Sequence, residues 1–123
     1  MATLRSAMLR QGATPVLDIS LDEAVQNATV YVTINQGGRQ LTKSNYNEDP
    51  SVTLTPVYDD EDVQIGTEIS IIFNQAETLY LKPGFGWIQV RWIFEDGTAD
   101  GSDIGRIEIG ESLLKVVIAN GRH

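Results

Sequence analysis

Residues 86–110 read GWIQVRWIFEDGTADGSDIGRIEIG, and apolar residues recur at every second position along two runs of this stretch. Successive side chains of a β-strand point to opposite faces of the sheet, so this alternation predicts strands with one buried face. In the first run the predicted buried face holds Ile88, Val90, Trp92 and Phe94. After a polar, glycine-rich turn, the second run points Ile107 and Ile109 inward. The stretch therefore predicts two strands that pack on a β-rich core.

The same two-residue period continues in the segments that precede this stretch. It predicts further strands near residues 17–21, 28–36, 39–44, 51–57 and 63–73. Gly37-Gly38 is typical of a two-residue hairpin turn, because glycine tolerates the positive φ that both turn positions require. Asn74 and Glu77 match a capping box, which predicts one or two helical turns that end before Pro83.

The number of short strands predicts the fold class. Seven to eight strands with one short helical crossover are typical of an all-β, immunoglobulin-like β-sandwich, and a small barrel is the alternative. A length of 123 residues fits a single domain over residues 1–123. We expect residues 1–8 to form a loosely held N-terminal arm and residues 113–123 to form an apolar C-terminal tail.

The composition excludes several classes of partner and chemistry. The chain has 17 acidic and 9 basic residues and a net charge of −8, whereas nucleic acids and anionic membranes bind positive surfaces. No cysteine is present, so disulfides and zinc–thiolate sites are excluded. No apolar run has the length of a signal peptide or of a membrane span. We therefore expect synthesis in the cytoplasm, with no nucleic acid and no membrane as partner.

The sequence offers little for catalysis. The sole histidine is the last residue, His123, and no Gly-x-Ser-x-Gly motif is present. Serine and threonine are weak nucleophiles without a fixed base, and the carboxylates here lie in predicted turns rather than in a cleft. We expect no enzymatic activity, no catalytic residue and no cofactor.

The turn of the opening stretch is the strongest metal candidate. Asp96, Thr98, Asp100 and Gly101 follow the first half of a calcium-binding loop. The twelfth position is Ile107, where a bidentate glutamate is needed, and no helices flank the loop. We therefore expect a plain hairpin loop without a metal. The acidic segment 59–62 is a second, equally weak candidate.

Two further features are candidate partner-binding surfaces. Trp87 lies on the face of its strand opposite the Trp92 stripe, where it either stacks on a sugar or a partner, or belongs to a second core. If the tail were extended, its apolar residues would lie on both faces; they are Leu113, Leu114, Val116, Val117 and Ile118. Such a segment either folds back over its own domain, or pairs with a neighbouring subunit by strand addition.

Four segments resemble motifs of one family of small proteins encoded in prophages of Gram-positive bacteria. Residues 9–15, LRQGATP, resemble the family's RQGTTP opening, and residues 74–79, NQAETL, resemble its TQEDTF element. Residues 89–92, QVRW, resemble its QVR strand, and residues 109–113, IGESL, resemble its VGE-L ending. The order and spacing agree over about residues 9 to 118, and the chain departs from the pattern around residues 46–67, which are longer here.

The resemblance implies a function that the residues alone do not reveal. The family is similar to phage structural or tail-associated proteins, and in general form to the immunoglobulin-like N-terminal domain of baseplate upper proteins. It implies a virion structural protein of the tail or baseplate, bound to other virion proteins or to copies of itself in a symmetric assembly. The alternatives are a carbohydrate- or receptor-binding module on the virion and a head-associated capsid or connector protein. In each case the chain moves from the host cytoplasm into the virion.

Overall fold

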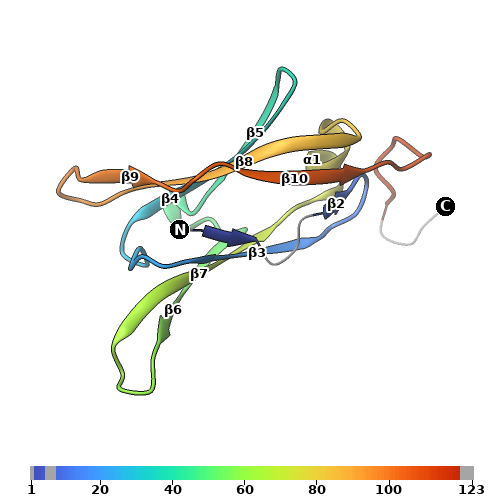
Figure 1. Cartoon of the computed structure of the whole chain (residues 1–123). Coiled ribbons are helices and arrows are strands. Elements are labelled where there is room, and N and C mark those ends of the chain that lie inside the picture. Colours follow the sequence, from blue (N-terminus) through green and yellow to red (C-terminus); the bar gives the residue numbers. More distant parts are fainter. Residues whose placement is uncertain (1, 5–7, 120–123) are drawn as a thin grey trace.

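A computed structural model describes residues 2–4 and 8–119 and confirms an all-β protein (Figure 1). Its strands are β1 (Ala2–Leu4), β2 (Met8–Arg10), β3 (Val16–Leu21), β4 (Thr29–Gln36), β5 (Arg39–Ser44), β6 (Val52–Tyr58), β7 (Gln64–Ile72), β8 (Gly84–Ile93), β9 (Ala99–Gly101) and β10 (Gly105–Gly110). Its helical segments are the 3-10 turn η1 (Tyr46–Glu48) and the helix α1 (Gln75–Tyr80). The described residues thus form more strands than the seven to eight predicted, and the additional strands are short.

The strands form two sheets. One sheet has the order β1-β3-β7-β6, and the other has the order β2-β10-β8-β4-β5, with β9 pairing only with β8. Neighbouring strands are antiparallel, except that β2 runs parallel to β10. Strands β5 and β6 lie at sheet edges, as their polar composition and Pro56 predicted.

The inner faces of the two sheets form one hydrophobic core. Ile88, Val90 and Trp92 of β8 are buried, and Phe94 packs against the same cluster. The predicted inward residues of the other strands are also buried, among them Leu17, Ile19, Val30, Val32, Ile34, Ile69, Ile71, Ile107 and Ile109. The two-residue period therefore assigned the buried face correctly on these strands.

Helix α1 connects the two sheets, since it follows β7 of one and precedes β8 of the other. The predicted capping box is present: Asn74 Oδ1 accepts the Glu77 backbone N–H at 2.8 Å, and Glu77 Oε1 accepts the Asn74 N–H at 2.9 Å. These bonds satisfy backbone donors that a helix N-terminus leaves free. The box fixes where the chain leaves the first sheet and therefore where β8 begins.

Glycines shape the strands at two places, the β4–β5 turn and the β6–β7 bulge. Gly37 and Gly38 have φ of 52° and 92° and close the β4–β5 hairpin, as predicted. Gly66 lies where a β-bulge shifts the pairing of β6 with β7. A Cβ atom at Gly66 would lie 2.3 Å from the Leu21 carbonyl oxygen, so β3 and β7 approach too closely there for any side chain.

The N-terminal residues differ from the prediction of a loosely held arm over residues 1–8. Ala2–Leu4 pairs with β3 in the first sheet, and Met8–Arg10 pairs with β10 in the second. The Gln11 N–H extends this second pairing by donating to the Gly110 oxygen at 2.9 Å. The buried side chain of Leu9 explains why this segment joins the domain, because leaving it in water would lose its burial energy.

Candidate functional site

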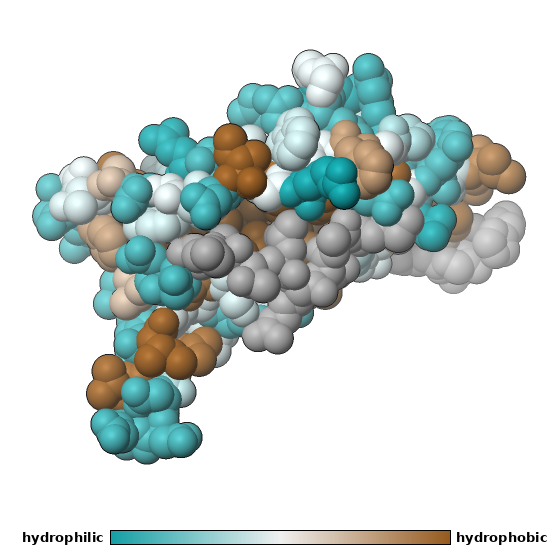
Figure 2. Space-filling model, in the orientation of Figure 1, coloured by the Kyte–Doolittle hydropathy of each residue, from teal (hydrophilic) through white to brown (hydrophobic). Residues whose placement is uncertain are grey.

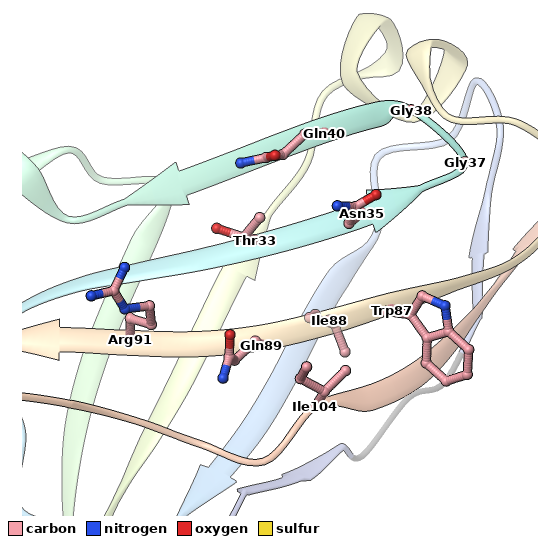
Figure 3. Close-up of a pocket in the computed structure, with 10 residues that line it drawn as sticks. All are labelled: Thr33, Asn35, Gly37, Gly38, Gln40, Trp87, Ile88, Gln89, Arg91 and Ile104. Atoms are coloured by element: carbon pink, nitrogen blue, oxygen red, sulfur yellow. The ribbon is translucent and has the colours of Figure 1, made fainter.

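The outer face of the second sheet carries an open groove across β4, β5 and β8 (Figure 3). Its volume is about 840 Å³, and its lining includes Thr33, Asn35, Gln40, Trp87, Gln89, Arg91 and Ile104, together with the hairpin glycines. Strand alternation explains this lining, because the outward residues of β4 and β8 are the polar partners of the buried stripe. The groove and the core are thus opposite faces of the same strands.

Trp87 stands at one end of the groove and Arg91 at the other, with Gln89 between them on β8 (Figure 3). The Trp87 side chain is 55% exposed, so the alternative of a second core residue is wrong. Gln89 Nε2 donates to the Ser102 carbonyl at 2.8 Å, which holds that amide in place. An exposed indole at one end, a fixed amide in the middle and a guanidinium at the far end suit a ligand with flat apolar faces and polar edges.

A second hollow continues the groove along the same face. It has a volume of about 380 Å³ and is lined by Tyr31, Thr33, Thr42, Arg91, Trp92, Ile93 and Ala99. Thr33 and Arg91 line both hollows, and the hydroxyls of Thr33 and Thr42 are 3.1 Å apart. The two hollows therefore form one elongated surface. The described residues that line it carry amide, hydroxyl, guanidinium and apolar groups, which can supply binding contacts.

The calcium candidates Asp96, Thr98 and Asp100 lie in and after the β8–β9 turn. Asp96 Oδ1 accepts the Thr98 N–H at 2.8 Å, and Asp100 Oδ1 accepts the Gly101 N–H at 2.8 Å. The bond from the Thr98 backbone lowers the pKa of Asp96 below its usual 3.8. Each carboxylate thus stabilises a turn in its own segment. In residues 2–4 and 8–119, no three metal-ligating side chains gather at one point.

The second acidic candidate, segment 59–62, forms the tip of the β6–β7 hairpin. Asp59 Oδ1 accepts the N–H of Glu61 at 2.8 Å and of Val63 at 3.0 Å. This carboxylate closes the turn in the same way as Asp96 closes its own.

The described part of the C-terminal tail contacts the first residue of α1, Gln75. Gln75 Oε1 accepts the Ile118 N–H at 2.7 Å, and Gln75 Nε2 donates to the Ile118 oxygen at 2.9 Å. These bonds hold the backbone but cover little of the side chains, since Leu113 is 96% exposed and Leu114, Val116, Val117 and Ile118 are also exposed. The tail therefore folds back and still presents an apolar surface, so its predicted role in partner binding stays a prediction.

The groove was found only in part from the sequence. Trp87 was identified as a binding candidate, but its polar partners Thr33, Asn35 and Gln40 were not. The signal that could have found them is that they lie on the outward face of the two strands beside Gly37-Gly38, combined with the pairing of β5 with β4 and of β4 with β8. Parity is visible in a sequence, whereas the pairing of β4 with β8 is not.

Comparison of the chain with protein-family models gave no match, and neither did comparison with curated proteins. No helix in the described ranges is long and apolar enough to cross a membrane.

Proposed function

We propose that the fold is an immunoglobulin-like β-sandwich. Its support is the strand order, because β1-β3-β7-β6 follows the A-B-E-D order of the first immunoglobulin sheet and β10-β8-β4 follows G-F-C of the second. The helical crossover of α1 then falls between strands E and F. Two separate sheets also favour a sandwich over the small barrel.

We further propose that the protein is a non-enzymatic structural component of a phage virion, in the tail or baseplate, which binds other virion proteins or copies of itself. The observation that carries this proposal is the apolar surface of residues 113–118, which the domain itself leaves uncovered. Exposed apolar surface of this kind is typical of protein–protein contact. The four motifs that resemble a prophage-encoded family support placement in a virion.

The test is the protein content of phage particles. Particles are purified on a density gradient after prophage induction in a strain that carries the gene, and their proteins are measured by mass spectrometry. We expect this chain in the particles at a constant ratio to a major tail protein. Absence from intact particles overturns the proposal, and cross-links to capsid or portal proteins alone move the chain to the head.

Carbohydrate binding on the virion is the second candidate function, and the groove favours it. Trp87 supplies a face on which a sugar ring can stack, while Asn35, Gln40 and Gln89 supply amides for its hydroxyls. A glycan array with the parent and with Trp87→Ala tests this role. Phe85→Ala is the matched control, because Phe85 is an equally exposed aromatic outside the groove. A glycan bound by the parent and by Phe85→Ala but not by Trp87→Ala supports the candidate, and no bound glycan contradicts it.

A further inference from the structure

The β6–β7 hairpin, residues 57–65, projects from the sandwich at the lower left of Figure 1 and is named here the acidic hairpin. Figure 2 shows brown apolar residues on its stem and teal residues at its tip. The tip reads Asp59-Asp60-Glu61-Asp62, and the exposed apolar residues of the stem are Val57, Tyr58, Val63 and Ile65. Tyr58, for example, is 55% exposed, so the domain itself does not cover the stem.

The other loops at this end of the domain are acidic as well. The pairings of Leu21 with Thr67 and of Thr67 with Pro56 place the end of β3 beside the base of the acidic hairpin. The β3–β4 loop there contains Asp22 and Glu23, and the β8–β9 turn contains Glu95 and Asp96. The loops of residues 22–28, 59–63 and 94–98 contain no lysine or arginine. The acidic residues of these loops therefore favour a negative potential at this end.

The opposite end, beside α1, carries several basic residues and is named here the basic end. A chain of contacts gathers them there. Arg39 donates to the Tyr80 oxygen, and the Lys82 N–H donates to Gln36 Oε1 at 2.6 Å. Gln11 Nε2 donates to the Leu81 carbonyl, and Gln11 Oε1 accepts from the Lys115 ammonium. The Arg10 guanidinium donates to the backbone carbonyl of Glu111 at 3.4 Å.

Few carboxylates offset these cations. The basic end comprises Arg10, Arg39, Lys82, Lys115 and the tail residues 113–118. Glu111 lies 3.4 Å from the Lys115 ammonium, and Glu77 is neutralised by Lys43 at 2.8 Å. The Lys82 side chain is exposed. The basic end thus combines positive charge with the exposed apolar side chains of the tail.

We infer that the acidic hairpin of one copy docks on the basic end of a second copy. The two surfaces match in two independent respects, because acids face bases at the tip and apolar side chains face apolar side chains on the stem and tail. The net charge of −8 makes two distant copies repel, but salt screens that repulsion beyond about 8 Å, whereas the local match acts at contact.

The acidic hairpin and the basic end are different surfaces at opposite ends of the domain (Figure 1), so each copy can bind one neighbour at each end. Such a heterologous contact closes into a ring or extends into a filament. The inference rests on the proposed assembly role and names its partner as a second copy of this chain.

Two charge-reversal variants test the contact. Variant A is Asp60→Lys with Glu61→Lys, which spares the turn-closing Asp59, and variant B is Lys82→Glu with Lys115→Glu. Sedimentation velocity measures the mass of the parent, A and B up to about 1 mM, where even a weak contact is half occupied. We expect the parent to associate, and A and B alone to associate at least about tenfold more weakly.

An equimolar mixture of A and B is the decisive arm of the experiment. In the mixture the unchanged acidic hairpin of B meets the unchanged basic end of A, so we expect that contact, and with it A–B association, to return. Glu48→Lys with Asp103→Lys is the matched control for A, because it makes the same change in net charge at exposed positions outside both surfaces. Thermal melts verify that each variant folds, and Lys82→Glu alone replaces B if loss of the Lys115 contacts unfolds it.

The outcomes separate this inference from the proposed function. A monomeric parent, or a mixture of A and B no more associated than either alone, overturns docking between copies. Association of A with an extract protein but never with B also overturns it and assigns the acidic hairpin to a different partner. Particle composition, measured independently, decides the virion role whichever result is obtained.

Discussion

The Lys43 ammonium lies 2.9 Å from Glu77 Oε1 and 2.8 Å from Oε2, which joins edge strand β5 to helix α1. The two side chains are 10% and 21% exposed, so water screens this ion pair only in part. Glu77 Oε1 also accepts the Asn74 N–H and so completes the capping box. One carboxylate therefore holds the helix N-terminus and attaches it to the sheet.

The first prediction is that Lys43 and Glu77 are energetically coupled. We expect Glu77→Ala to lower the free energy of unfolding by about 1–3 kcal/mol, because it leaves the largely buried Lys43 ammonium unpaired. Glu77→Gln should cost less, because its amide oxygen can still accept from Asn74. A double-mutant cycle with Lys43→Ala, measured by urea unfolding, should give a coupling of about 0.5–3 kcal/mol. Strictly additive effects would show that the pair contributes nothing.

The second prediction compares the two tryptophans of β8. Trp92 is 4% exposed and belongs to the core, whereas Trp87 lies in the groove. Trp92→Ala should cost about 3–5 kcal/mol, which is enough to unfold a domain of ordinary stability. Trp87→Ala should cost much less, because more than half of Trp87 stays in water in the folded domain. Equal melting temperatures of Trp92→Ala and the parent would contradict this assignment of faces.

The long strands were predictable because each has enough residues to show the two-residue alternation of apolar and polar side chains. Over Ile88–Phe94, one face is consistently apolar, and a slip by one residue would expose Trp92, so sequence and packing agree. The capping box was equally predictable, because its bonds join residues that are only three positions apart in the sequence. In both cases the interaction that decides the structure is local in the sequence.

The remaining features depend on contacts between distant residues. Strands β1, β2 and β9 have three residues each, too few to show a period, and form because a partner strand offers hydrogen bonds. Burial of Leu9 likewise requires β10, which lies 100 or so residues away along the chain. The groove required the order of β5, β4 and β8 in the sheet, which no local pattern encodes.

The third prediction concerns the close approach at Gly66. Gly66→Ala would place a Cβ atom 2.3 Å from the Leu21 carbonyl, and backbone cannot yield as a flexible side chain can. We expect a loss of about 3 kcal/mol in the free energy of unfolding. Gly38→Ala is the control, since no atom lies within 4 Å of its added Cβ and only its φ of 92° opposes the substitution. It should cost about 1 kcal/mol, and a larger loss at Gly38 than at Gly66 would refute the steric explanation.

The fourth prediction is that the β8–β9 turn binds no calcium specifically. Its acids already accept backbone N–H groups, and Ile107 occupies the position of the bidentate glutamate. Isothermal titration with calcium should give no stoichiometric heat, and calcium should leave the melting temperature unchanged. Micromolar binding that Asp100→Ala abolishes would overturn this prediction.

The fifth prediction concerns the tail after Ser112. Its backbone is attached to the domain through Gln75, but its apolar side chains from Leu113 to Ile118 are exposed. Among the described residues of the tail, deletion of residues 113–123 therefore removes apolar side chains that are largely in water. We expect the truncated chain to melt within a few degrees of the parent and to lose self-association in light scattering, because an exposed apolar side chain contributes to stability only when something covers it. Gln75→Ala is the control that releases the attachment without removing apolar surface, and it should retain association. A parent that is monomeric at high concentration, with a truncated form that melts far lower, would instead mean that the tail serves only its own domain.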